Sequence, residues 1–155
     1  MEKYDITVVE YPKKRLMGMK VRTSMQKARA DCPALFESFI PRVSELPAGS
    51  CSNGFYGVSK MVNTEDLDYW AAVEMTEGSS IPEGMECVDI PSGEYAKCAV
   101  PNMEKLGETY MYIYDEWPKN QTKYVMDGYS PSFELYPANW QHGASFEIYA
   151  PVKKN

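Results

Sequence analysis

The second half of this sequence repeats the first, and the repeat limits the possible folds more than any other feature. The offset is about 79 residues. Residues 9–12 align with 88–91, residues 70–73 align with 149–152, and one residue of slippage places Phe55-Tyr56 on Phe133-Glu134. The order strand, strand, helix, strand, strand recurs in each half. We therefore predict two copies of one unit, at about 4–77 and 86–153.

The spacing of apolar residues predicts one main helix in each copy. The first lies within Thr23–Leu46, with Asp31 as a candidate cap and a kink or end at Pro41. The second starts near Asn102 and ends at Pro118. Its apolar stripe consists of Met103, Leu106, Tyr110, Ile113 or Tyr114, and Trp117. Residues 119–130 are polar and are expected to form a long connection.

These elements predict the fold class. We expect one α+β domain over residues 1–155, built from a duplicated strand–helix–strand–strand unit of the SHS2 type. A pseudo-twofold axis would relate two antiparallel sheets. Each sheet would bury one face under its helix, and the opposite faces would curve around a central groove. Such a boundary between two halves is a common place for a ligand pocket.

One short strand between two prolines, Pro131 and Pro137, carries an acid among aromatic residues. Strand alternation places Phe133 and Leu135 on one face and Glu134 with Tyr136 on the other. A carboxylate on an inner face is costly unless it is paired or hydrogen-bonded. Glu134 therefore either faces water or lines a pocket that receives a cation.

The aromatic content favours the second interpretation of Glu134. The chain has 12 Tyr, 5 Phe and 3 Trp, and tyrosine suits cavities as well as cores. An acid surrounded by aromatic rings attracts lipophilic cations through its charge and through cation–π contacts. The aromatic residues that the repeat allows near Glu134 are Tyr69, Trp70, Tyr95, Tyr112, Tyr114, Tyr136 and Tyr149.

Charge and cysteine usage exclude several classes of function. The net charge of −6 disfavours nucleic acid as a partner, because phosphate binding needs clustered Lys and Arg. The 4 Cys form no C-x-x-C pair and lie far in sequence from the single His142, so we expect no metal site and no cofactor. Nothing resembles a secretory signal or a membrane span, which favours a cytoplasmic protein with reduced thiols.

Several motifs in order resemble a known family. They are Val9-Glu10-Tyr11-Pro12, Leu16-Met17-Gly18, Phe55-Tyr56-Gly57-Val58, Ile90-Pro91-Ser92-Gly93-Glu94-Tyr95-Ala96, Tyr114-Asp115-Glu116-Trp117-Pro118, Phe133-Glu134-Leu135-Tyr136 and Glu147-Ile148-Tyr149-Ala150-Pro151-Val152. The chain resembles the GyrI-like small-molecule-binding domain, the effector-binding domain of AraC-type and MerR-type regulators, which includes the drug-binding part of BmrR.

The resemblance implies the duplicated fold, a central groove and a set of binding residues. It assigns the acidic ligand-binding position to Glu134, and aromatic positions to Tyr56, Tyr69, Tyr95, Tyr112 and Tyr136. We add Trp70 from the repeat. Because the first expected strand begins almost at Met1, we expect a stand-alone member without a DNA-binding module.

Three functions are compatible with these residues. The first is a protein that senses or sequesters amphipathic, aromatic or cationic compounds, and we favour this one. The second, implied by the resemblance, is a hydrolase of reactive electrophiles such as cyclopropane-type alkylators, with Glu134 as general base. The third is an inhibitor that binds a protein such as gyrase. A homodimer is compatible with all three.

Overall fold

The fold is known from a computed structural model, which describes residues 4–128 and 130–155. Within these residues the chain is α+β, with helices packed on one antiparallel sheet of nine strands. The strand order is β1-β6-β9-β8-β3-β4-β2-β5, and β7 pairs with β9 outside this path. The strands are β1 (Ile6–Tyr11), β2 (Lys14–Ser24), β3 (Phe55–Met61), β4 (Asp66–Glu74), β5 (Glu86–Ile90), β6 (Gly93–Val100), β7 (Tyr124–Met126), β8 (Ser132–Tyr136) and β9 (Phe146–Lys154).

The two halves of the chain contribute strands to the sheet in the same way. In the first half β4 lies between β2 and β3, and in the second half β9 lies between β6 and β8. The halves also exchange strands, because β1 pairs with β6 while β5 pairs with β2. The central contact joins β3 to β8. A duplicated unit would have this arrangement, and the duplication itself stays a prediction.

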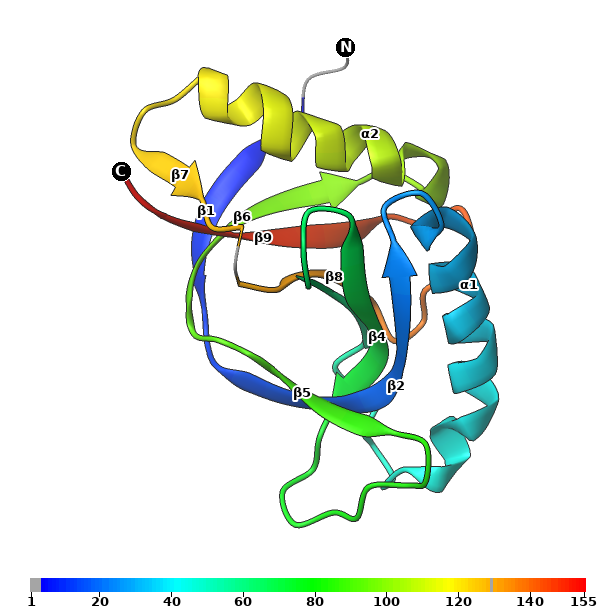
Figure 1. Cartoon of the computed structure of the whole chain (residues 1–155). Helices are drawn as coiled ribbons and strands as arrows, with labels where there is room; N and C mark the ends of the chain where they lie inside the picture. The colour runs from blue at the N-terminus through cyan, green and yellow to red at the C-terminus, as the bar shows by residue number, and fades with distance from the viewer. Residues whose placement is uncertain (1–3, 129) are drawn as a thin grey trace.

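The sheet curls strongly, and the two helices lie on its outer face (Figure 1). Helix α1 (Ala28–Phe39) covers β2 and β4, where Leu35 and Phe39 pack with Met17 and Tyr69. The second helical segment covers β6 and β9, where Ile113 packs with Ala96 and Ile148. The inner face of the curl holds a separate aromatic core that includes Tyr56, Trp70, Tyr95, Phe133 and Tyr149.

The first predicted helix is shorter than expected. The predicted region Thr23–Leu46 contains α1 and a 3-10 turn, Ile40–Glu45. The change falls beside Pro41, whose nitrogen has no hydrogen to donate to the preceding turn. Asp31 does not cap the helix, because the cap position is Lys27 and Asp31 lies inside the first turn. Its Oδ2 instead accepts a 2.7 Å hydrogen bond from the Thr23 hydroxyl.

The second helical segment is irregular. It comprises a 3-10 turn (Met103–Lys105), α2 (Leu106–Met111), a π-helical turn (Tyr112–Glu116) and a last 3-10 turn (Trp117–Lys119). A π-helical turn widens the hydrogen-bonding pattern and is often found at functional sites. The end near Pro118 agrees with the prediction from the sequence.

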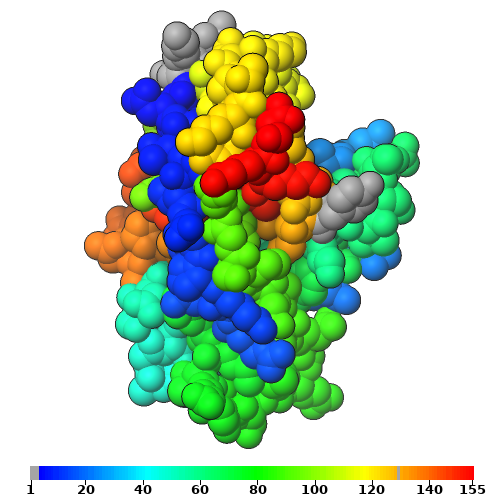
Figure 2. All heavy atoms as spheres, turned by 90° about the vertical axis from the view of Figure 1, so that its left-hand side faces the viewer, coloured from blue at the N-terminus to red at the C-terminus, as the bar shows by residue number. Residues whose placement is uncertain are grey.

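The polar stretch after this segment is not all connection, because it contains β7. This short strand pairs with the end of β9 in the register Tyr124 to Lys154. Figure 2 shows β1, in blue, running beside β6 on one face of the molecule, and β6 pairs with β9 along its other edge. No helix in the described ranges combines the length and apolarity needed to cross a membrane.

Candidate functional site

Glu134 lies in the middle of the sheet, on the face that the helices cover. It belongs to β8, which pairs with β9 on one side and with β3 on the other. Alternation along β8 places Phe133 and Leu135 in the inner core and turns Glu134 and Tyr136 to the outer face, as predicted. Glu134 is only 4% exposed. The expectation that it lies in a groove opposite the helices is therefore wrong.

Three tyrosine hydroxyls donate hydrogen bonds to the Glu134 carboxylate. Tyr136 and Tyr69 donate to Oε1 at 2.6 and 3.2 Å, and Tyr110 donates to Oε2 at 2.6 Å. These side chains come from β8, β4 and α2, so the carboxylate joins both halves of the fold. Hydrogen bonds from neutral donors satisfy the oxygens of a buried carboxylate without neutralising its charge.

Aromatic rings enclose this group of tyrosines. Phe36 of α1 presents its ring edge-on to Tyr69 and Tyr136, at centroid distances of 6.2 and 5.7 Å. Tyr136 also stacks on Phe146 at 4.5 Å. Tyr110 stacks on Tyr114 at 6.3 Å. We call Glu134 with Tyr69, Tyr110 and Tyr136 the carboxylate cluster.

The carboxylate cluster has no internal counter-ion. In the described ranges no Lys, Arg or His side chain pairs with Glu134, and no cation contributes to its pKa. Burial raises the pKa of Glu134, and the hydrogen bonds from the three tyrosines oppose this shift. Burial and the Glu134 charge raise the pKa of Tyr69 and Tyr110, so both stay protonated donors. The Cys32 thiol is close enough that burial and this charge raise its pKa to about 12.

A glycine makes room for the carboxylate cluster. Gly57 of β3 is the register partner of Glu134 across the central β3–β8 contact. A β-carbon added at Gly57 would lie 2.1 Å from the Tyr69 hydroxyl oxygen and 3.0 Å from Glu134 Oε1. Any side chain at this position would displace Tyr69, so the absence of a side chain is a condition for the cluster.

The structure brings together only part of the predicted set of site residues. Tyr69 and Tyr136 contact Glu134. Tyr56, Trp70 and Tyr95 belong to the inner core, on the opposite face of the sheet. Tyr112 packs against Tyr4 at a centroid distance of 5.5 Å and does not contact Glu134.

Tyr56 does not lie beside Glu134, although the repeat alignment paired the two positions. In β3, Phe55 and Gly57 share the outer face with Glu134, and Gly57 is its register partner. A shift of one residue moves a strand side chain to the other face. Tyr56 instead shares the inner core with Phe133, at a centroid distance of 5.7 Å.

Tyr110 is the site residue that sequence reasoning missed. Its spacing places it in the predicted apolar stripe of the second helix, and the predicted set of site residues does not include it. The sequence did indicate a polar partner for Tyr110, because a tyrosine on the helix face that packs on a sheet needs an acceptor for its hydroxyl. Its acceptor is Glu134. In the part of the chain that the structure describes, no group of His, Cys, Asp and Glu side chains is arranged to hold a metal ion.

The raised pKa of Glu134 predicts a pH effect on stability. The folded state binds the proton of the Glu134 carboxyl more tightly than the unfolded chain does, where the pKa of this group is near 4.5. The unfolding free energy of the wild type should therefore decrease as pH rises from 4.5 through the raised pKa, whereas that of Glu134→Gln, which lacks the carboxyl, should not show this decrease. Urea unfolding of both proteins across this range measures the difference, and a difference that does not change with pH would contradict the assignment.

Comparison with solved structures confirms the fold. The fold is similar to that of SAV2435 bound to tetraphenylphosphonium, with a TM-score of 0.76, 16% identity and coverage of 96% of this chain and 94% of that one. It is similar to an integron cassette protein from the mobile metagenome of Vibrio cholerae, with a TM-score of 0.65, 16% identity and 97% coverage of both chains. It is also similar to the C-terminal domain of EcmrR, with a TM-score of 0.67, 14% identity and coverage of 98% and 99%.

The sequence itself identifies the family. The model of the integron-associated effector-binding protein Cass2 matches residues 7–152. The chain belongs to this family of small-molecule effector-binding domains, which confirms the GyrI-like resemblance. No curated protein matched the sequence.

Proposed function

We propose that this protein is a cytosolic receptor for lipophilic, aromatic cations, and that the Glu134 carboxylate supplies the charge that attracts them. One observation carries the proposal: a carboxylate that is 4% exposed has three neutral donors and no cationic partner among the described residues. A buried charge of this kind is costly, and a bound cation would offset that cost.

The surroundings of Glu134 favour a cation with aromatic groups over a small hydrated ion. The rings of Phe36, Tyr69, Tyr110 and Tyr136 lie around the carboxylate. Aromatic faces attract organic cations, and aromatic ligand groups stack on such rings. The likeness to SAV2435 bound to tetraphenylphosphonium agrees with this choice of ligand class and makes that ion a suitable probe.

A ligand that reaches Glu134 must displace part of the structure, because the carboxylate is enclosed. Tyr110 covers Oε2 and belongs to α2, a helix of 6 residues that continues into a π-helical turn. Helix α1 is longer, at 12 residues, and its apolar face is packed on β2 and β4. We propose that the second helical segment moves and α1 stays in place. Sequestration or sensing of such compounds would use the same binding step.

Two ions of the same shape and opposite charge test the proposal. Tetraphenylphosphonium should bind with a measurable Kd in a calorimetric titration, and tetraphenylborate should bind at least about tenfold more weakly, because a buried carboxylate repels it. Equal affinity for the two ions would show that apolar contact alone drives binding, and the role of Glu134 would be rejected.

A further inference from the structure

The inner face of the sheet contains a pocket that is separate from the carboxylate cluster. Its volume is about 440 Å³, and its walls come from β3, β4, β5 and residues 130–131. Trp70, Val88, Pro91 and Pro131 supply apolar surface, and Lys60 supplies charge. None of the carboxylate cluster residues lines it. Because Trp70 and Val88 belong to the inner core, the sheet separates this pocket from Glu134.

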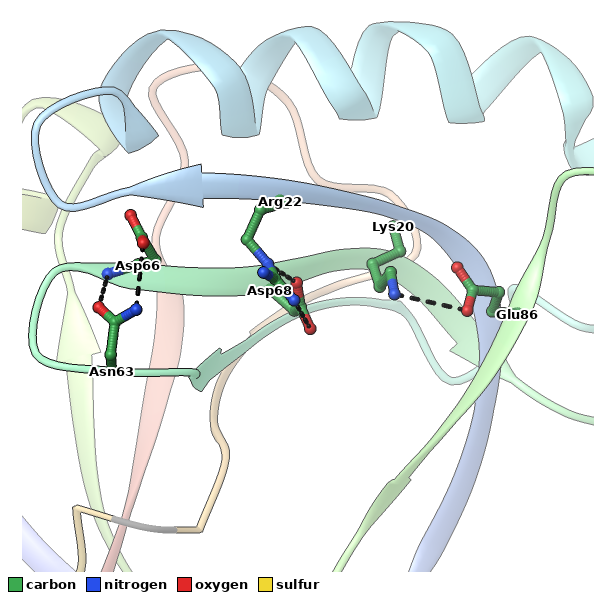
Figure 3. A network of polar contacts seen from close by, with 6 residues as sticks. All are labelled: Lys20, Arg22, Asn63, Asp66, Asp68 and Glu86. Carbon is green, nitrogen blue, oxygen red and sulfur yellow. Dashed lines mark hydrogen bonds and ion pairs between the residues drawn. The ribbon is translucent and has the colours of Figure 1, made fainter.

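Among the charged side chains around the pocket, one cation has no ion-pair partner in the described ranges. Arg22 pairs with Asp68 at 2.5 Å, and Lys20 pairs with Glu86 at 3.6 Å, side by side along β2, β4 and β5 (Figure 3). Asp89, which lines the pocket, pairs with Arg15 at 3.0 Å. Each nearby carboxylate therefore has its own cationic partner.

Lys60 is the cation that remains. Its ammonium pairs with no carboxylate among the described residues, although its positive charge also acts on Asp68, its register partner. The pocket thus combines an apolar wall with an available ammonium group, in a chain whose net charge is −6. This is the reverse of the carboxylate cluster, which carries a charge that needs a cation.

Trp70, whose side chain lines the pocket, carries an unsatisfied hydrogen-bond donor. The residue is 7% exposed, and its indole N–H has no acceptor among the described residues. Lys20 lies over the same ring, with Nζ 5.7 Å from the centroid. Buried indole N–H groups usually find an acceptor, so an oxygen atom from a bound molecule would satisfy this one. The indole nitrogen is covered by neighbouring atoms, so a ligand oxygen must displace these atoms slightly to accept its hydrogen bond.

We propose that this pocket is a second ligand site, selective for small aromatic molecules that carry a carboxylate. The aromatic part would lie against Trp70, Val88 and the two prolines. The carboxylate would pair with the Lys60 ammonium and accept the Trp70 N–H. The proposal goes beyond the proposed function, because it concerns the other face of the sheet and ligands of the opposite charge.

Three naphthalene compounds provide the test: 2-naphthoate, 2-naphthylmethanol and 2-naphthylmethylammonium. The indole N–H signals of the 3 tryptophans are followed in ¹⁵N NMR spectra, and the Trp70 signal is assigned by its loss in Trp70→Phe. Naphthoate should shift the Trp70 signal and leave that of Trp117 in place. It should bind more tightly than the alcohol and the ammonium compound.

The variants separate a specific site from non-specific binding. Lys60→Gln should weaken naphthoate binding about tenfold, since it removes a charge-assisted contact from an exposed side chain without affecting the core. Trp70→Phe should weaken it as well, and Trp117→Phe is the matched control that should not. An unmoved Trp70 signal, equal affinity for the three compounds, or an unchanged Kd in Lys60→Gln would each overturn the proposal. Because the probe is an anion, failure here leaves the tetraphenylphosphonium result unaffected.

Discussion

Glu134→Gln should weaken the binding of tetraphenylphosphonium about 100-fold while leaving the protein folded. The substitution keeps the shape of the side chain and an oxygen that can accept from the tyrosines, but it removes the charge. Loss of one partner of a buried ion pair costs about 3–5 kcal/mol. The charge of this cation is spread over a large apolar body, so we expect the lower part of the range. Calorimetric titration of wild type and variant measures the ratio.

The control for this prediction is Glu37→Gln. Glu37 lies on the exposed side of α1, and its substitution changes the net charge by the same amount. If the overall field of the protein attracted the cation, both variants would weaken binding equally. Glu37→Gln should change the Kd less than twofold, and equally tight binding by Glu134→Gln and Glu37→Gln would contradict a role for the Glu134 charge.

Gly57→Ala should lower the unfolding free energy by about 2–4 kcal/mol and abolish tight binding of the cation. The new β-carbon would lie 2.1 Å from the Tyr69 hydroxyl oxygen, so the ring must move out of a packed core. Overpacking of a core costs about 1–3 kcal/mol, and the lost hydrogen bond to a charged group adds to this cost. Urea denaturation measures the stability, and the tetraphenylphosphonium titration measures the binding.

Gly107→Ala is the matched control for the effect at Gly57. Beyond its chain neighbours and the backbone of α2 itself, a β-carbon at Gly107 would meet no atom of the described residues within 4 Å. Alanine is the better helix former by about 1 kcal/mol, so this variant should be as stable as the wild type or slightly more stable. Equal stability of Gly57→Ala and the wild type would mean that the Tyr69 ring adapts at little cost and that the cluster does not depend on Gly57.

The features that depend on local alternation could be predicted from the sequence. The two prolines and the pattern of β8 were enough to place Glu134 and Tyr136 on one face, opposite Phe133. The order of elements pointed to this α+β fold, which the solved structures confirm, and the motifs pointed to an effector-binding family, which the family match confirms. These predictions need only the period of a strand and the length of a helix.

The face on which Glu134 meets its partners could not be predicted from local patterns. It depends on how the sheet curls and where the helices pack, and the repeat alignment paired Glu134 with Tyr56, which lies in the inner core. Tyr69 and Trp70 are adjacent in β4, yet one reaches Glu134 and the other lines the inner pocket. The prediction placed both residues in one site because they are neighbours in the sequence. Strand alternation instead places their side chains on opposite faces of the sheet.

Contacts between the bound cation and the tyrosine rings test most directly whether ligands bind at the carboxylate cluster. Intermolecular nuclear Overhauser effects can be measured between the phenyl protons of tetraphenylphosphonium and the protein. We expect contacts to the rings of Tyr69, Tyr110 and Tyr136, all of which donate to Glu134. Contacts to Trp70 and Tyr149 of the inner core, with none to these three tyrosines, would contradict it.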